Sequence, residues 1–323
     1  MTAEYAYGLP LDQLWFGLVF AILGTFLVLD GFDFGVGAIF ALRRDHDERE
    51  ALLDVIGPFW HANEVWLVVF GGALFAAFPP VYARLFSRHY LLMFAVLLAL
   101  AARGLGPELR HQRDDAAWQR WWGRSFAAGS IATPVLLGLF LGNWLVGATT
   151  TITLVGALTG LTALALCVLL GAAFIRLKLG DPLYAAARTY GQAAAASYLV
   201  LVVATLAAIW TRHPGLRDAI TALLPLGLVA LTVLVLLVFV GALRVGWHVA
   251  AFVAGAVLTY GLVALVAVLM HPQVDPGSGL TLAEGVISPL PLAMMSGVSV
   301  LLLPLVALYF VILYSEFRGP LHD

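Results

Sequence analysis

Long apolar segments follow one another along almost the whole chain. A helix that crosses a membrane needs about 20 mostly apolar residues. About nine segments have this character, and they lie near 14–42, 52–78, 90–109, 125–146, 152–175, 192–211, 219–243, 247–270 and 289–314. Because 62% of the 323 residues are hydrophobic and only 11% are charged, the chain is too apolar for a soluble protein. The sequence therefore predicts an all-α, multi-pass membrane protein with a single transmembrane domain over residues 1–323.

Lysine and arginine are unevenly distributed between the two ends of these spans. If the N-terminus lies outside, the inner segments hold twelve of the 17 basic residues, the outer segments hold four, and Arg103 lies within a span. Because basic residues favour cytoplasmic loops, this pattern predicts nine spans with the N-terminus outside and the C-terminus inside. The longest polar connection is expected near 104–124. The polar start of the chain carries no basic residue, so we expect the first apolar segment to remain as a helix.

Charge and composition exclude several classes of function. A net charge of −2 gives no basic surface for nucleic acid, and the single cysteine, Cys167, excludes an internal disulfide and a cysteine-rich metal cluster. The sequence contains no phosphate-binding loop and no nucleophile beside a base, so we expect no catalytic residue and no metal site in this chain. Membrane haems usually take His or Met ligands, but only His61 lies clearly at depth. We therefore expect no haem ligated by this chain.

Two pairs of ionisable residues lie inside the first two predicted spans. Asp30 and Asp33 belong to the first span, and His61 and Glu64 belong to the second. A spacing of three residues places each pair on one helix face. At about 1.5 Å per residue, both pairs lie roughly 13 and 18 Å from the inner ends of their helices. We expect all four groups at one level, and ionisable groups at such depth are costly and therefore candidates for function.

The third predicted span adds Arg103 and, five residues later, Glu108 near its inner end. Arg103 could neutralise one carboxylate and so make the cluster much less costly to bury. Gly31 and Gly35 would let a neighbouring backbone approach the first span closely. The pattern indicates a partly hydrated half-channel that opens to the inner side and ends near mid-membrane. Carboxylates and a histidine in sequence are the groups that a proton relay needs.

A structural role is the alternative for the same cluster, because ion pairs also hold membrane helices together. Asp33 lies one turn closer to water and is the more structural of the two aspartates, whereas Asp30 is the stronger relay candidate. Trp60 and Trp66 flank His61 and could pack against a cofactor or quinone. Core packing is the favoured role for both tryptophans.

Four motifs occur in a recognisable order in the first third of the chain. They are DGFDFGVG (30–37), GPFWHANEVWL (57–67), GGALFAAFPPVYA (71–83) and RGLGPELR (103–110). Together they resemble subunit II of cytochrome bd-type quinol oxidases. The rest of the chain is similar to that family mainly in helix number and apolar character.

The resemblance implies a pseudo-symmetric heterodimer with a larger subunit I that carries haem b and haem d. The complex would be a terminal respiratory oxidase in the cell membrane of a prokaryote, oxidising a membrane quinol and reducing O2 to water. This electrogenic reaction would take its protons from the inside. The present chain would be the haem-free partner that supplies the subunit interface and a cytoplasmic proton path. The resemblance leaves open the identity of the quinone, whether a quinone binds this chain, cyanide sensitivity and small accessory subunits.

The resemblance also implies roles for single residues. Asp30 matches the first acidic residue of the DGFD motif, and Arg103 and Glu108 match an arginine and an acidic residue on the third helix. Trp60 and His61 match a Trp-Asp pair, so His61 departs from the family pattern. Glu64 could take over the acidic role, which leaves open whether His61 or Glu64 is the relay group.

Two other functions are compatible with the same residues. A stand-alone proton-coupled transporter would show inverted repeats and broken helices with a binding site at mid-membrane, and the sequence shows no convincing repeat. A purely scaffolding subunit would use the buried charges only to hold helices together.

Overall fold

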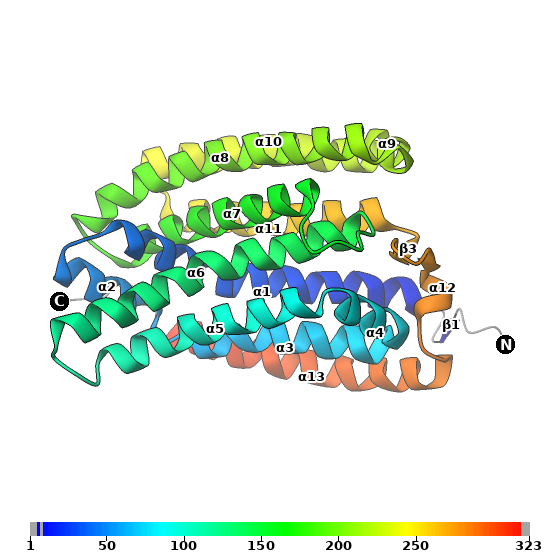
Figure 1. The fold of residues 1–323 in the computed structure, drawn as a ribbon, viewed down its shortest axis with the longest axis horizontal. Coiled ribbons are helices and arrows are strands. Elements are labelled where there is room, and N and C mark those ends of the chain that lie inside the picture. The colour runs from blue at the N-terminus through cyan, green and yellow to red at the C-terminus, as the bar shows by residue number, and fades with distance from the viewer. Residues whose placement is uncertain (1–4, 7–8, 318–323) are drawn as a thin grey trace.

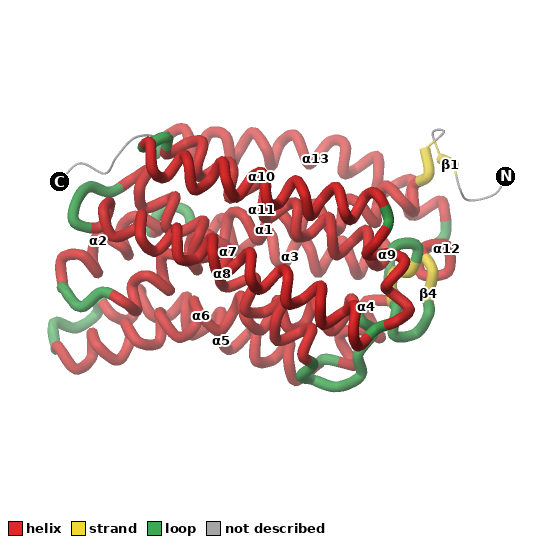
Figure 2. Tube along the Cα trace, turned by 90° about the horizontal axis from the view of Figure 1, so that it is seen from above, coloured by secondary structure: helices red, strands yellow, loops and turns green. Residues whose placement is uncertain are grey.

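The computed structural model describes residues 5–6 and 9–317, which form a bundle of long helices with loops at its two ends (Figures 1 and 2). In this part of the chain, eight helices are long and apolar enough to cross a membrane. They are α1 (Leu11–Leu42), α5 (Tyr90–Arg110), α6 (Ala116–Leu145), α7 (Leu154–Lys178), α8 (Leu183–Arg212), α10 (Leu223–Val245), α11 (His248–Met270) and α13 (Pro289–Glu316). The prediction of an all-α, multi-pass membrane protein is confirmed.

Shorter elements connect or cover these helices. They are β1 (Tyr5–Ala6), β2 (Leu9–Pro10), α2 (His46–Ile56), α3 (Trp60–Ala77), α4 (Pro79–Arg88), η1 (Pro214–Leu216), α9 (Arg217–Thr221), β3 (Gln273–Asp275), β4 (Leu280–Thr281) and α12 (Leu282–Gly285). The strands form two antiparallel pairs, β1 with β2 and β3 with β4.

The single span expected near 52–78 is divided into two helices. The first, α2, ends at Ile56, and α3 starts at Trp60 after a turn that contains Gly57 and Pro58. Proline lacks the backbone N–H that a continuous helix requires and its ring clashes with the preceding turn, so a break at this point follows from the sequence. Helix α3, with 18 residues, nevertheless packs against α1 within the bundle (Figure 1), although it is not among the eight helices that are long and apolar enough to cross a membrane.

The long polar connection expected near 104–124 is also mostly helical. Helix α5 continues to Arg110 and α6 already begins at Ala116, which leaves only residues 111–115 between them. Arginine, glutamate and glutamine are good helix formers, so the polar sequence extends both helices beyond their apolar parts. Most charged residues of this stretch therefore lie in the last turns of α5 and the first turns of α6.

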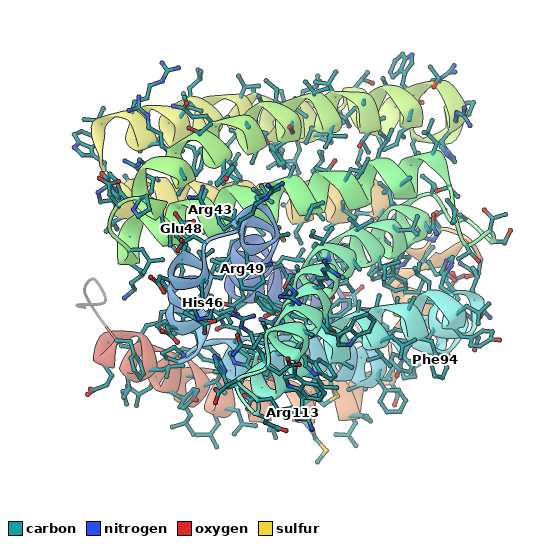
Figure 3. The ribbon with its side chains drawn as sticks, turned by 60° about the vertical axis from the view of Figure 1, so that its left-hand side comes forward. Arg43, His46, Glu48, Arg49, Phe94 and Arg113 are labelled. Atoms are coloured by element: carbon teal, nitrogen blue, oxygen red, sulfur yellow. The ribbon has the colours of Figure 1, made fainter. Side chains whose placement is uncertain are left out.

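The arginine-rich ends of the helices gather at one end of the bundle. Figure 3 shows Arg43, His46, Arg49 and Arg113 at the end where α2 lies. Arg43 forms a two-pronged ion pair with Glu48, from Nε at 2.7 Å and from Nη2 at 2.5 Å. Helices α1 and α13 both begin at the opposite end (Figure 1), as an odd number of passes requires. That the arginine-rich end faces the cytoplasm is still a prediction.

Helix α1 is the central element and contacts α3, α6, α7 and α11. Its crossing with α7 depends on Gly35, because a Cβ atom built there would lie 1.8 Å from the carbonyl oxygen of Cys167. Gly171 occupies the reciprocal position on α7, where a Cβ would lie 2.5 Å from the carbonyl carbon of Gly35. The close approach expected at Gly35 is therefore present, and it fixes the height of α1 in the bundle.

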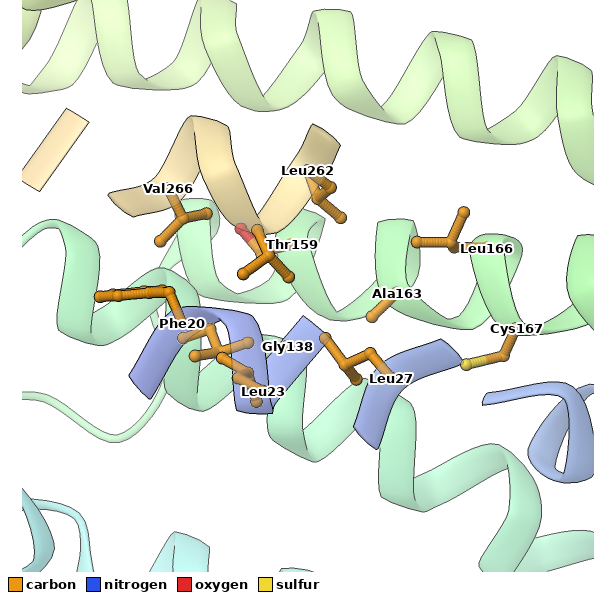
Figure 4. Close-up of a pocket in the computed structure, with 12 residues that line it drawn as sticks. Phe20, Leu23, Leu27, Gly138, Thr159, Ala163, Leu166, Cys167, Leu262 and Val266 are labelled. Carbon is orange, nitrogen blue, oxygen red and sulfur yellow. The ribbon is translucent and has the colours of Figure 1, made fainter. Parts of the chain in front are cut away.

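A small cavity of about 20 Å³ remains in the core beside this crossing (Figure 4). Its walls are apolar side chains such as Phe20 and Leu166, with Cys167 at one side. The hydroxyl of Thr159, a polar group in this wall, already donates to the carbonyl of Val155 at 2.8 Å. An apolar cavity of this size stays dry and marks a packing gap rather than a binding site.

The end of the bundle opposite α2 is closed by the β3–β4 hairpin. The buried Asp275 carboxylate accepts two bonds from Arg88, at 3.0 and 3.3 Å. Trp144 on α6 donates through Nε1 to the carbonyl of Val274 at 3.0 Å. These contacts attach the hairpin to two helix ends, so the Arg88–Asp275 pair has a structural role.

Candidate functional site

The guanidinium of Arg103 is the centre of a buried charge cluster. The residue lies on α5 and is only 1% exposed. Its Nη2 lies 2.7 Å from Oδ1 of Asp30 and 3.3 Å from Oδ2 of Asp33, and its Nη1 lies 3.6 Å from Oε2 of Glu64. Three carboxylates from α1 and α3 therefore surround one cation on α5. The structure brings these four residues of the predicted pathway together.

The two aspartates differ in their surroundings. Oδ2 of Asp33 accepts hydrogen bonds from Arg103 and, at 2.9 Å, from Nδ2 of Asn63. Asp30 meets Arg103 at ion-pair distance, but within the described residues neither of its oxygens has a hydrogen bond of good geometry. Asp33 is thus held by two donors at Oδ2 and lacks a hydrogen bond only at Oδ1, whereas both oxygens of Asp30 lack one.

Local packing explains how α5 places Arg103 at this point. Gly129 on α6 lies against the backbone of α5, and a Cβ there would lie 2.5 Å from the amide nitrogen of Arg103. The guanidinium carbon also lies 5.0 Å from the ring centre of Phe34 and 5.2 Å from that of Trp60. Aromatic faces attract a cation electrostatically, and here they cover the parts of it that the carboxylates leave free.

Asn63 and Tyr314 belong to the site although the sequence analysis did not select them. Nδ2 of Asn63 donates to the carbonyl of Leu29 at 3.0 Å as well as to Asp33, and its Oδ1 accepts from the hydroxyl of Tyr314 at 2.9 Å. Asn63 is fully buried in α3. Asn63 could have been selected from the sequence, because it is an amide side chain between His61 and Glu64. Tyr314 lies in the last helix and could not be found from residue spacing.

His61 and Glu108 lie beside the cluster rather than in it. The His61 ring lies on the ring of Trp60, with 3.5 Å between their centres, and its side chain is exposed. Both His61 and Glu108 line a cavity of about 290 Å³ that also reaches Arg103. His61 lies in the first turn of α3, one residue after the helix begins.

This cavity opens toward the α2 end of the bundle. Asp54 and Gly57, from α2 and the turn after it, line one side of it, and His111 lines another. Arg103 and Trp60 lie at its inner limit. At roughly 30 Å³ per molecule it can hold several waters. Ionisable side chains therefore continue from the surface of the protein to the buried guanidinium.

A second group of charges lies near the mouth. Glu50 on α2 accepts hydrogen bonds from Arg110 and, at 3.1 Å, from Nε2 of His111. Burial alone would raise the pKa of Glu50, but the hydrogen bonds from Arg110 and His111 outweigh it and hold this pKa below its ordinary value. Glu50 is thus a negatively charged group at neutral pH that attaches α2 to the end of α5.

The remaining predicted residues have packing roles. Trp66 contacts the ring of Phe310 on α13, with 5.6 Å between ring centres. Gly31 faces α7, where an added Cβ would lie 3.3 Å from a methyl group of Leu170. Trp60 is buried over Arg103 and covers the cavity wall. Core packing was the favoured role for both tryptophans.

The residues around the cavity do not fit a haem held by this chain. The ring of His61 packs on that of Trp60 at an angle of 31°, and His111 is engaged with Glu50 through Nε2. The other wall groups are mainly carboxylates and a guanidinium, which are not the axial ligands that membrane haems use. Elsewhere in the described residues no group of three or more His, Cys, Asp or Glu side chains could hold a metal ion.

Comparisons with known proteins agree with the fold and the motifs. A family model for cytochrome bd terminal oxidase subunit II matches residues 11–317. The cytochrome bd ubiquinol oxidase subunit 2 of Bacillus subtilis (strain 168) is 35% identical over 314 residues, which cover 92% of each chain. The cytochrome bd-I ubiquinol oxidase subunit 2 of Escherichia coli (strain K12) is 28% identical over 357 residues, covering 95% of this chain and 94% of the relative.

The fold agrees with that of a solved oxidase. A chain of the bd oxidase from Geobacillus thermodenitrificans superimposes with a TM-score of 0.76 at 17% identity, covering 96% of this chain and 99% of that one. This likeness supports the bundle architecture alone, whereas the family model and the Bacillus relative identify the family. The chain belongs to the cytochrome bd terminal oxidase subunit II family and is one subunit of a haem-containing quinol oxidase in the bacterial respiratory membrane.

Proposed function

We propose that this chain is the haem-free partner of a haem-bearing subunit I and conducts protons toward the oxygen-reducing site of that subunit. The observation that carries the proposal is the cavity of about 290 Å³ that leads from the α2 end to Arg103 and its three carboxylates. In this proposal the chain acts as a single transmembrane domain with its arginine-rich end in the cytoplasm.

Protons would enter through the groups that line the cavity. Asp54, His61 and Glu108 lie along its wall between the α2 end and Arg103. Water can join titratable groups that lie too far apart for direct hydrogen bonds. His61 suits this outer position, because its exposed ring can exchange protons with water and with the groups around it. The histidine in place of the family's acidic residue is then an entrance group.

The carboxylates around Arg103 would hold the proton inside. If all three carboxylates were ionised, they and the guanidinium would together carry a net charge of −2. Asp30, Asp33 and Arg103 are buried at this site. Such a charge is costly in a membrane interior, so a shared proton is favoured. Asp30 is the best carrier, because its oxygens keep unused acceptor positions, whereas Asp33 is held by Asn63 and Arg103.

Glu64 would be the group through which protons leave this chain, and it would lie on the face that contacts the partner subunit. Its side chain is 32% exposed although it contacts Arg103. A carboxylate that faces lipid at this depth is costly, so we expect the partner subunit to cover it. The same face of α3 exposes Val65, Val68 and Phe75. Helix α13 alongside has little buried surface, which also suits a subunit interface.

Proton delivery from one side of the membrane would make the reaction electrogenic. Protons taken from the cytoplasmic side meet electrons from quinol at the oxygen-reducing site, while quinol releases its protons on the other side. The haems b and d belong to subunit I in this proposal, since the residues of the present chain do not fit them. A quinone bound to this chain would find an apolar groove of about 520 Å³ between α1, α10 and α11, with His271 at one end.

The replacement of Asp30 by Asn tests the proposal in the assembled oxidase. Asp30→Asn keeps the shape of the side chain and removes its proton exchange. Oxygen consumption with quinol as donor should fall at least about tenfold, because proton transfer through a positioned group contributes roughly 10²- to 10⁴-fold. Proton uptake by proteoliposomes should fall with it, while the haem absorption of the complex stays normal.

Asp47→Asn is the matched control, since Asp47 is an exposed residue of α2 outside the cavity. The control should retain the rate of the unmodified oxidase. Full turnover and full proton uptake by an assembled Asp30→Asn oxidase would refute proton conduction through this cluster and leave the scaffolding role.

A further inference from the structure

Three arginines from three helices line a second polar pocket at the α2 end of the bundle. The pocket has a volume of about 580 Å³ and is separate from the cavity that reaches Arg103. Arg176 comes from the last turn of α7, Arg188 from the second turn of α8, and Arg244 from the last turn of α10. The pocket thus lies where the arginine-rich ends of these helices meet.

Arg176 is the buried base of the pocket. The residue is only 6% exposed. Its Nη1 donates to the carbonyl of Tyr184 at 2.9 Å and its Nη2 to the carbonyl of Leu243 at 3.3 Å. Its Nε is buried and has no hydrogen-bond partner in the described part of the protein. A buried donor without a partner is costly, so this N–H points to a missing acceptor in the pocket.

The charges of the pocket are unbalanced. Asp181 is its one acidic residue, and Oδ1 of Asp181 already accepts from the amide of Ala185 at 3.1 Å. Within the described chain, neither Arg188 nor Arg244 lies within ion-pair distance of a carboxylate, and both are exposed. Three cations therefore share the pocket with one carboxylate, which favours an anion between them.

Helix capping explains only part of this arrangement. Cations stabilise the C-terminal ends of helices, which accounts for Arg244 on α10 and for the contact of Arg176 with the carbonyl of Leu243. Arg188 lies in the second turn of α8, so it does not cap a helix C-terminus. The guanidinium carbon of Arg176 also lies 3.9 Å from the ring centre of Tyr184, which covers one face of the cation but gives its Nε no hydrogen-bond acceptor.

We propose that this pocket binds the phosphate group of an anionic membrane lipid. Guanidinium groups match a phosphate in charge and geometry, and Thr189 and Gln192 add polar groups to the lining. Basic pockets between transmembrane helices are a known form of site for anionic headgroups. Trp247 and Val249, the large apolar residues just beyond the pocket, are 68% and 65% exposed. They offer a surface for acyl chains, which a soluble phosphate would not need.

Lipid titration of the delipidated oxidase complex, followed by native mass spectrometry, tests the proposal. Phosphatidylglycerol should bind more tightly than phosphatidylcholine, which has no net charge. The double variant Arg188→Gln/Arg244→Gln should weaken binding of phosphatidylglycerol about 25-fold, because each basic residue contributes roughly fivefold. The double variant Arg188→Lys/Arg244→Lys keeps both charges and should recover most of the affinity.

Arg120→Gln is the control, because Arg120 is an exposed arginine on α6 at the same end of the bundle and outside the pocket. It should leave the affinity for phosphatidylglycerol unchanged. Equal losses in Arg120→Gln and the double Gln variant would overturn the proposal, as would unchanged binding by that double variant. A parallel titration with inorganic phosphate should not displace the lipid, and full displacement would show a soluble anion as the ligand instead.

Discussion

The hydroxyl of Tyr314 donates a hydrogen bond of 2.9 Å to Oδ1 of Asn63, although 251 residues separate the two in the sequence. Asn63 in turn donates to Asp33 at 2.9 Å. One amide therefore connects the last turns of α13 with a carboxylate on α1. Within the described chain, Leu292 is the one residue of α13 that is buried. Because α13 therefore has few buried contacts, the Tyr314–Asn63 hydrogen bond is a main attachment of this helix to the site.

Tyr314→Phe should loosen this attachment. The substitution leaves the buried Oδ1 of Asn63 without its donor, which should lower the free energy of unfolding by about 1–3 kcal/mol. The melting temperature of the purified complex should fall by a few degrees, and oxygen consumption should decline less than in Asp30→Asn. Tyr309→Phe is the control, since Tyr309 on the same helix is 54% exposed. Equal melting temperatures of the two variants would show that the bond contributes nothing.

Arg103→Leu should prevent normal assembly. It leaves Asp30, Asp33 and Glu64 without their shared cation, and loss of one partner from a buried ion pair costs about 3–5 kcal/mol. The yield of haem-containing complex from membranes should drop severely. Addition of Asp30→Asn and Asp33→Asn to the same chain should restore part of the yield, because the stranded charges are then removed.

The control for this series is Arg84→Leu, since Arg84 is an exposed residue of α4. It should give the yield of the unmodified chain. A normal yield of the Arg103→Leu complex would contradict the prediction, because it would mean that the three carboxylates do not need this cation.

Gly35→Ala should separate α1 from α7. The new Cβ would lie 1.8 Å from the carbonyl oxygen of Cys167, which is backbone and cannot rotate away. Overpacking of a dense core costs roughly 1–3 kcal/mol or more, so thermal stability of the complex should fall clearly. Gly72→Ala on α3 has no atom within 4 Å of the added Cβ and should be neutral. Similar melting curves for both variants would contradict a close crossing at Gly35.

The meeting of Asp30, Asp33 and Glu64 at Arg103 could be predicted from the sequence for a physical reason. Ionisable groups inside an apolar chain must find partners, and a three-residue spacing places each pair on one helix face. Arg103 was the one cation in a predicted span, so it was the natural partner. Composition and spacing therefore determine this part of the site.

The positions of His61 and Tyr314 show what the sequence left undetermined. The break at Gly57 and Pro58 placed His61 in the first turn of α3 rather than deep in a span. Periodicity assumed one continuous helix, so it did not show that a new helix begins just before His61 or that the ring of His61 is exposed. Tyr314 reaches Asn63 only through the packing of α13 against the site, which no local pattern encodes.

Glu50 should make the stability of the complex depend on pH in the acidic range. Its hydrogen bonds from Arg110 and His111 hold its pKa below the ordinary value of 4.5, so its stabilising effect is complete above that value and is lost as the pH falls through the lower, folded-state pKa. Because the side chain is 28% exposed, the effect is screened and should not exceed about 1 kcal/mol. Glu50→Gln should therefore melt below the unmodified complex at pH 7, and this difference should shrink below pH 4.5 and disappear as the pH falls through the lower, folded-state pKa. Asp47→Asn, at an exposed position of α2, is the control and should show no pH-dependent change in melting temperature. If the lower melting temperature of Glu50→Gln persisted unchanged in acid, the charge of the Glu50 carboxylate would play no part.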